Sequence, residues 1–556
     1  MLLRLVVIAC CLSSANAMGQ SLPVTDNLFD RLEGSKSLSM IDSDSAFGER
    51  VSKSDGSFSF NVPILNIPGN AGMDIKVSYT LKAHPGELIL WQFEEDLPFI
   101  GGNFSASAGW TSRAGGTNRC SSTGAPTSVR PDNGRPDWFQ PDEYWTGYEL
   151  NVPDKAGGFI DAISGNLPSW GPTNGGPYQW SNNQNWFFSC IPLLEGAGEG
   201  FLGHSPDGRK YHFNRMRVHR ELVTLDKYAW TGQDIDLARN EVRIYAGRIE
   251  DRFGNFIEDL VASDGRAVTR DVNGTVTTYT YAGKQWVVNT AHPFTVTYPD
   301  GSQWKATASQ LFGSAGSSEV SCSGPNGTPT GIMANTNAPA QTVTIEAPSG
   351  ATGVFQYKRI AIGYSEVQPS CYPVDNFSGA PYYLHQLVNP MSLVSRTITG
   401  PGLPASSMTI SYGPPNGCIF GGSGSSGCTA SSPKTRTVTY TKSSGDYTVY
   451  TFGNRFLVDA DLLLKVEEGS PSTGVMRTTS FEYARLPAVG FLIVSGMASL
   501  YSPNHYYRVV QTARVVTQNG KRFTWRVDAT CGPGTELCFD EFGRPTKVVR
   551  GSTVAP

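Results

Sequence analysis

The sequence predicts an all-β protein built from successive antiparallel hairpins. Its 61 glycines and 36 prolines make up about 17% of the 556 residues, compared with about 12% in an average protein. Long helices tolerate few residues of either type. Short segments rich in Val, Thr, Tyr and Phe alternate between polar and apolar positions, as at 272–281, 342–346, 435–440 and 447–452. This pattern is typical of half-buried strands.

Turn chemistry predicts where the hairpins bend. Six Asx-Gly dipeptides stand between alternating segments, at 55–56, 207–208, 264–265, 273–274, 300–301 and 519–520. A two-residue Asx-Gly loop supplies the positive φ angles of a tight hairpin. Two of these tips belong to a wider pattern, in "SPDGRKYHF" and "YPDGSQW", and "SSGDYTVYTF" is a looser echo of it. The sequence therefore predicts a weakly repeated, irregularly spaced hairpin.

The first seventeen residues are predicted to be a signal peptide. Arg4 precedes an apolar run, and Ala15-Asn16-Ala17 has the small-x-small form of a cleavage site. The mature chain would begin at Met18. The alternative, a lipoprotein signal with an acylated Cys10, would leave a much shorter apolar core. No later run reaches the ~18 apolar residues of a bilayer span, so we expect a secreted or cell-surface protein without a transmembrane span, with the periplasm as a further location.

Charge and motifs predict neither a nucleic-acid partner nor a known catalytic centre. The net charge is −4 and the pI is about 6.0, which gives no basic footprint for nucleic acid or anionic lipid. The sequence lacks GxSxG, GxxxxGK[ST], HExxH and CxxC patterns. We therefore expect no catalytic residue, no cofactor and no metal, although a hydrolase with a carboxylate pair would leave no such motif.

Three histidines form the densest group, at His204, His212 and His219. A two-residue loop at Asp207-Gly208 would place His204 opposite Tyr211. His204 and His212 would then project from opposite faces of the ribbon. The sequence therefore predicts no metal site there.

Eight cysteines of the mature chain are predicted to form disulfides, because an exported chain meets an oxidising compartment. They are Cys120, Cys190, Cys322, Cys371, Cys418, Cys428, Cys531 and Cys538. Spacing favours Cys418–Cys428 and Cys531–Cys538 as short loops, whereas Cys120–Cys190 and Cys322–Cys371 follow from chain order alone. A zinc site is the less favoured alternative, because no pair has CxxC spacing and no His stands at zinc-finger distance.

Tryptophan is unevenly distributed, with seven of the eleven between residues 91 and 186. One interpretation is a glycan-binding face, because sugar C–H groups stack on aromatic rings. Its candidate residues are Trp138, Trp145, Trp180 and Trp186. The favoured interpretation is that this loop-rich segment uses Trp as its core.

Three segments resemble the exported Rhs/YD-repeat family. "GSFSFNVPILNIPGNAGMDIKVSYT" (56–80) is similar to the family's entry segment, and "EDRFGNFIED" (250–259) looks like its Asp-x-x-Gly-Asn hairpin. "FDEFGRPTKVV" (539–549) resembles its repeat signature Tyr-Asp-x-x-Gly-Arg, with Phe539 in place of Tyr. The matched repeat positions are Asp251, Gly254, Asn255, Phe539, Asp540, Gly543 and Arg544.

The last motif also has a physical interpretation that does not depend on the family. Asp540 is expected to bond turn amides, and Gly543 to take a positive φ that other residues disfavour. Phe539 is expected to pack on a neighbouring hairpin. Each such unit has an apolar face that only a neighbouring unit can bury.

The resemblance implies a function. In the family, hairpins wind into a hollow β-shell that can enclose a C-terminal toxin, after a Pro- and Asp-rich signature that this sequence lacks. We therefore expect an N-terminal region without most of the repeat array and without the toxin. It would serve as a secreted or cell-surface scaffold in cell contact, presentation or interbacterial competition. The alternative is a glycan-binding adhesin, so the expected partners are a downstream Rhs-type polypeptide or a cell-surface glycan.

Four regions are expected along the chain. A signal peptide (1–17) precedes an N-terminal β-segment (18–85). A Trp-rich loop and β insertion follows (86–200), and then a hairpin-rich β region that ends in a YD-like repeat (201–556).

Overall fold

The computed structural model describes residues 48–554, apart from internal gaps. The longer gaps are 84–90, 164–171, 229–233, 310–339, 367–386, 419–426, 488–506 and 532–536, and gaps of one to three residues occur at 55, 57, 113–115, 135–137, 146, 154, 173, 389–390, 456–457 and 541–542. The expected signal peptide, the mature start at Met18 and the pair Cys322–Cys371 lie outside the described residues.

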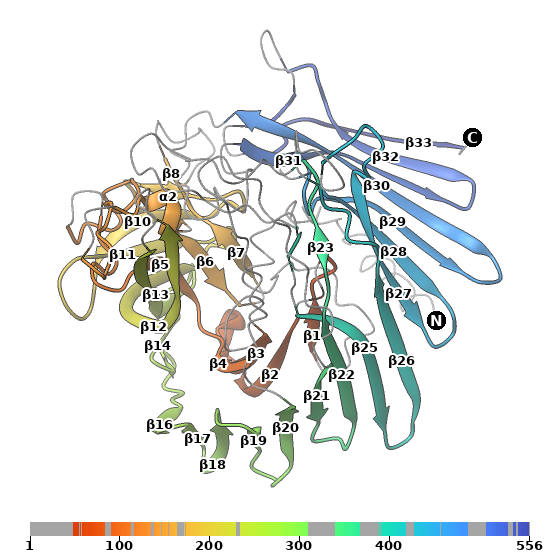
Figure 1. The fold of residues 1–556 in the computed structure, drawn as a ribbon. Helices are drawn as coiled ribbons and strands as arrows, with labels where there is room; N and C mark the ends of the chain where they lie inside the picture. The colour runs from red at the N-terminus through yellow and green to blue at the C-terminus, as the bar shows by residue number, and fades with distance from the viewer. Residues whose placement is uncertain are drawn as a thin grey trace, which may run out of the picture.

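The described chain is all-β and antiparallel, as the sequence predicts. Its two short helices are η1 (Asn70–Gly72) and α2 (Pro141–Tyr144). None of the helices in the described ranges has the length and apolar character that a bilayer crossing requires. Three large sheets account for nearly all the strands (Figure 1).

The first sheet has four strands in chain order. They are β1 (Glu49–Val51), β2 (Phe58–Ile67), β3 (Ile75–Ala83) and β4 (Trp91–Glu95). Alternation along β2 buries Phe60, Val62 and Ile64 and leaves Pro63 exposed, which is the period of a strand with one face in the core.

The second sheet has eleven strands and contains the Trp-rich segment. Its strands are β5 (Phe99–Ser105), β6 (Glu149–Val152), β7 (Ala156–Phe159), β8 (Asp161–Ala162), β9 (Trp180–Ser181), β10 (Phe187–Pro192), β11 (Glu199–His204), β12 (Lys210–Tyr228), β13 (Asp234–Glu250), β14 (Phe256–Glu258) and β15 (Val261–Ala262). The long strands β12 and β13 pair along most of their length, with several bulges, and β13 then pairs with β5.

The third sheet has sixteen strands and sweeps from β16 at the bottom of Figure 1 to β33 at the upper right. Its strands are β16 (Thr269–Asn273), β17 (Val276–Tyr281), β18 (Lys284–Asn289), β19 (Phe294–Thr297), β20 (Gln303–Ala308), β21 (Gln341–Glu346), β22 (Thr352–Arg359), β25 (Met391–Gly400), β26 (Leu403–Tyr412), β27 (Thr435–Lys442), β28 (Tyr447–Gly453), β29 (Leu463–Ser470), β30 (Gly474–Pro487), β31 (Tyr507–Gln518), β32 (Lys521–Val527) and β33 (Val548–Val554). A small ribbon of β23 (Ile362–Gly363) and β24 (Leu387–Val388) lies apart from it.

Two hydrophobic cores hold these sheets together. The four-stranded sheet and the sixteen-stranded sheet share the first core, in which Phe60 meets Phe355 edge-on at 4.7 Å and Phe93 stacks on Trp304 at 5.5 Å between ring centroids. The second core belongs to the eleven-stranded sheet and its loops. Sheet membership therefore changes near residues 96–98 and 263–268, while the eleven-stranded sheet runs across the boundary expected at 200/201.

One turn geometry recurs at the hairpin tips. Three-residue loops end at a glycine with φ between 74° and 89°, at Gly208, Gly254, Gly265, Gly301, Gly350, Gly445 and Gly543. In each, the residue before the loop donates its N–H to the carbonyl of the residue after it, and the glycine N–H returns to the carbonyl before the loop. Three-residue hairpin loops with these bonds are typically a type I turn followed by a left-handed residue in a bulge.

The loop at Asp207-Gly208 has three residues rather than the expected two, so the register of the flanking strands differs from the expectation. His204 pairs with Lys210 rather than with Tyr211. His204 and His212 therefore share one face of the ribbon, and the expectation of opposite faces was wrong. The cause is the extra loop residue, because a shift of one position moves every side chain to the other face.

Two other Asx-Gly tips form two-residue loops, one in the predicted position and one shifted by a residue. Asn519-Gly520 forms the predicted two-residue loop, with φ of 51° and 67° and Gln518 paired to Lys521. At 273–274 the loop is Gly274-Thr275, because Asn273 already pairs with Val276. Asp55 lies outside the described residues.

Candidate functional site

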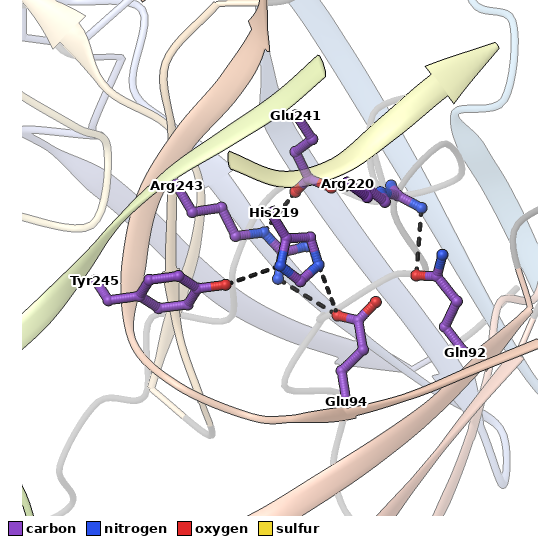
Figure 2. Close-up of polar contacts among 7 residues, drawn as sticks. All are labelled: Gln92, Glu94, His219, Arg220, Glu241, Arg243 and Tyr245. Atoms are coloured by element: carbon purple, nitrogen blue, oxygen red, sulfur yellow. Dashed lines mark hydrogen bonds and ion pairs between the residues drawn. The ribbon is translucent and has the colours of Figure 1, made fainter. Parts of the chain in front are cut away.

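Strand β4 lies between the two cores and carries adjacent carboxylates. Successive side chains of a strand point to opposite faces, so Glu94 faces β12 and β13 while Glu95 faces β16 and β17. Glu94 contacts His219 and Arg243, and Glu95 contacts Arg270. We call this arrangement, with the residues of Figure 2, the β4 junction.

On the Glu94 side, His219 lies between a carboxylate and a phenol. Its Nε2 is 3.1 Å from Glu94 Oε2, and its Nδ1 is 2.9 Å from the Tyr245 hydroxyl (Figure 2). Arg243 Nη1 lies 3.4 Å from the same Glu94 oxygen, and its guanidinium covers the ring of Phe99 at 4.1 Å. The long strands β12 and β13 supply the basic groups, and β4 supplies the acid.

Glu241 extends this hydrogen-bond network from Arg243 to Arg220. It accepts from Arg243 Nε at 2.6 Å and from Arg220 Nε at 2.5 Å, and Arg220 reaches Gln92 at 3.5 Å. Figure 2 shows the resulting chain of contacts from Tyr245 to Gln92. Bonds between charged partners are shorter and stronger than neutral ones, which suits a network taken out of water.

The two acids on this side are held ionised. Burial disfavours the Glu241 carboxylate, but the charges of Arg243 and Arg220 outweigh it and lower its pKa to about 2. Burial also opposes ionisation of Glu94, yet the hydrogen bond from His219 and the charge of Arg243 hold its pKa well below the usual range. Arg243 has its pKa raised, because these two acids outweigh its own desolvation.

The pKa of Glu95 is shifted in the opposite direction. Arg270 Nη2 lies 2.7 Å from its carboxylate, and the hydroxyls of Tyr79 and Tyr279 lie 3.1 Å apart nearby. Burial nevertheless raises the pKa of Glu95, because a single arginine offsets only part of the desolvation. Two neighbouring glutamates thus have pKa values shifted in opposite directions.

The β4 junction has no room for a substrate. The adjoining cavity, lined by Glu94, Glu95, Asn151 and Arg243 among others, has a volume of about 10 Å³, which is enough for about one water molecule. The β4 junction therefore has a structural role: its charged side chains connect the eleven-stranded sheet to the four-stranded sheet.

The two motifs that resemble a repeat adopt the same turn. Asp251 Oδ1 accepts the backbone N–H groups of Phe253 and Asn255 at 2.8 and 2.9 Å, and Gly254 has a φ of 84°. Asp540 Oδ1 accepts the N–H of Arg544 at 2.9 Å, and Gly543 has a φ of 74°. The carboxylate and the glycine therefore act as the sequence predicts.

Arg544 has two roles in its turn. Its Nε donates to Asp540 Oδ2 at 2.8 Å, and its guanidinium also bonds the Asn185 side chain of the Trp-rich segment. Phe539 is half-buried and forms an isolated bridge with Pro545. Its expected packing on a neighbouring hairpin stays a prediction.

The candidate glycan-binding tryptophans do not form one exposed face. Trp145 and Trp180 are fully buried and Trp186 is 3% exposed, so these three lie within the second core. A buried ring offers no face to a sugar, and their assignment as ligand contacts was wrong. Trp138 is 42% exposed, with the Arg130 guanidinium 5.0 Å from its ring.

Three of the expected cysteine pairs are disulfides. Cys120–Cys190, Cys418–Cys428 and Cys531–Cys538 are bonded, with Cα atoms 5.4, 5.0 and 5.3 Å apart. The first fastens the Trp-rich loops to β10, where the Trp180 indole donates to the Cys120 carbonyl at 2.7 Å. Among the residues that the structure describes, no group of three or more His, Cys, Asp or Glu side chains is arranged to hold a metal ion.

Sequence reasoning missed the β4 junction. The available signal was the presence of charged residues among apolar ones in "RVHRE" (217–221) and "NEVRIY" (240–245), a pattern that an exposed strand face also produces. Their burial depends on how β12 and β13 pair and on the approach of β4, which no local pattern specifies.

No family model matches the sequence, and no curated protein has significant similarity to it.

Proposed function

We propose that the chain is a secreted or cell-surface scaffold of Rhs/YD-repeat type, which acts by contact and presentation rather than by catalysis. The observation that carries this proposal is the unbroken ladder of sixteen antiparallel strands that shares one core with the four-stranded sheet. Such a wide sheet of hairpins offers a large framework built from repeated units.

The turns support the proposed kinship. The Asp-x-x-Gly segments 251–254 and 540–543 lie almost three hundred residues apart and adopt one geometry, with the acid bonded to the turn and the glycine in the left-handed region. Five further tips share the same loop without the leading Asp. A recurring hairpin unit is what a YD-type array requires.

Buried ion pairs support a framework in which distant segments are fastened together. Arg396 lies 2.8 Å from Glu49 and Arg436 lies 2.5 Å from Asp461, and all four side chains are at most 7% exposed. Arg436 also donates to the Ser54 carbonyl at 2.5 Å. These contacts tie β1 and its turn to the middle of the large sheet.

The disulfides support export. Three bonds among the described cysteines are consistent with an oxidising compartment, in which such bonds persist. Export is tested by expressing the tagged full chain and sequencing the N-terminus of the product outside the cytoplasm. The sequence should start at Met18, and deletion of residues 2–17 should retain the product inside the cell.

The contact function is tested by competition. A strain with the gene deleted and its parent would each be grown with a marked competitor, on a solid surface and across a filter that prevents contact. A change in competitor survival on the surface alone supports the proposal. Equal survival in both arrangements, with the protein verified outside the cell, would contradict it.

A further inference from the structure

We propose that a cleft between β2 and the hairpins of β18 to β20 binds a short pyranose oligosaccharide. The cleft has a volume of about 650 Å³, which lies within the usual range of about 300–1,000 Å³ for small-molecule sites. Its lining includes Pro63, Asn66, Lys284, Trp286, Tyr298 and Asp300. Its lining residues come from β2, β18 and the turns that follow β19 and β21, and Figure 1 shows β18 toward the lower end of the large sheet.

Two aromatic rings form the apolar part of the cleft. Trp286 pairs across the sheet with the fully buried Tyr279, and both Trp286 and Tyr298 pack against the first core while remaining half-buried. The Tyr298 hydroxyl donates to the Pro63 carbonyl at 2.8 Å, which fixes that ring against β2. Rings held in this way present apolar surface to sugar C–H groups with little further loss of side-chain entropy.

The polar groups of the cleft are of the kinds that sugar hydroxyls need. Lys284 supplies a donor, Asp300 supplies an acceptor, and the exposed Asn66 side chain supplies both. Asp300 is fixed before any ligand arrives, because its Oδ1 accepts the N–H and hydroxyl of Ser302 at 3.0 and 2.6 Å. A sugar hydroxyl can donate to the acid, and a hydroxyl oxygen can accept from the amine.

Charge and shape favour this ligand over others. Lys284 and Asp300 carry opposite charges at one cleft, which disfavours a partner with many charges of a single sign. A wholly apolar ligand would leave both charged groups without a bond on the ligand. An oligosaccharide offers both an apolar ring face and hydroxyls, so it matches the whole lining.

This site differs from the one that the tryptophan distribution suggested, because it uses Trp286 in the large sheet. It is also independent of the proposed scaffold role, since a scaffold without a sugar site would still be a scaffold. The competition experiment and the binding experiment can therefore fail separately.

The test is binding of the purified mature chain to an array of neutral and acidic pyranose oligosaccharides of various lengths. Calorimetry then follows with the best probe. Trp286→Ala is expected to weaken binding about tenfold, which corresponds to a loss of about 1.4 kcal/mol of binding free energy from the stacked ring. Trp138→Ala, at a ring that is 42% exposed and lies outside the lining of the cleft, is the matched control and should bind as the parent does.

Two variants at the rim of the cleft keep the test valid if the Trp286→Ala variant does not fold. Trp286 touches the core, whereas Lys284→Ala and Asp300→Asn change exposed side chains and should leave thermal unfolding unchanged. Each is expected to weaken binding severalfold. The proposal is overturned if the parent binds no saccharide, or if both rim variants bind as tightly as the parent, whatever the state of the Trp286→Ala variant.

Discussion

Glu94 and Glu95 are adjacent on β4, yet their carboxylates bind opposite sheets. Glu94 lies 3.1 Å from His219 of the eleven-stranded sheet, and Glu95 lies 2.7 Å from Arg270 of the sixteen-stranded sheet. The alternation of a single strand thus connects two bodies that have separate hydrophobic cores. Removing either carboxylate tests a different contact between sheets.

Loss of the Glu94 carboxylate should strongly destabilise the β4 junction. Glu94→Ala leaves Arg243 with one of its two acids and His219 without its carboxylate partner, and breaking a buried ion pair costs about 3–5 kcal/mol. Denaturant unfolding of the variant would show a lower midpoint than that of the parent. Glu482→Ala is the control, because its pair with Arg526 is about half exposed and an exposed pair contributes less than about 1 kcal/mol.

The pH dependence should have opposite signs for the two glutamates. The pKa of Glu94 is lowered in the fold, so its stabilisation is present above the unfolded pKa and is lost as pH falls through the folded value. The pKa of Glu95 is raised, so its contribution becomes less favourable as pH rises through the unfolded pKa toward the folded one.

Urea unfolding of Glu94→Gln and Glu95→Gln between pH 3 and 7 measures this difference. Relative to the parent, Glu94→Gln should lose more stability at pH 7 than at pH 3. Glu95→Gln should instead lose less stability at pH 7 than at pH 3, because ionisation of the buried Glu95 carboxylate itself lowers the stability of the parent as pH rises. Equal losses for both variants across this range would contradict the assignment.

The sequence predicts the strands and turn residues well because those features are local. Alternation along β17 and the φ angles at Asn519-Gly520 depend on a few neighbouring residues. The register at Asp207-Gly208 was predicted wrongly, because the same dipeptide serves two-residue and three-residue loops. The burial of Trp145 agrees with the favoured interpretation of the Trp-rich segment. The contacts of Glu94, in contrast, depend on which distant strands pack together, and Asp-Gly spacing or composition carries no information about that.

The left-handed glycine of the recurring turn should be sensitive to substitution at Gly254. Its φ is 84°, and a Cβ built there would meet no atom within 4 Å. Gly254→Ala should therefore cost about 1–2 kcal/mol through backbone conformation alone. Gly254→Asn is the matched control, since Asn tolerates this conformation; equal unfolding midpoints for the Ala variant and the parent would refute the stated cause.

The disulfides should differ in how much they stabilise the chain. Cys120–Cys190 spans 70 residues and Cys531–Cys538 spans 7, so chain entropy predicts about 4 and about 2 kcal/mol respectively. Double Cys→Ser variants of each pair, compared by denaturant unfolding, measure the difference. A larger loss for the short loop would show that chain entropy does not govern these bonds.

The two interpretations of the tryptophan-rich segment predict opposite results for Trp180. Trp180 is fully buried, and its indole donates to the Cys120 carbonyl at 2.7 Å. Trp180→Ala would empty a large core site and leave that carbonyl without its partner, so the free energy of unfolding should fall by about 3–5 kcal/mol. Trp138→Ala, at a ring 42% exposed, should change it by less than about 1 kcal/mol. If both variants unfold at the same denaturant concentration as the parent, the Trp-rich segment does not use Trp180 as its core.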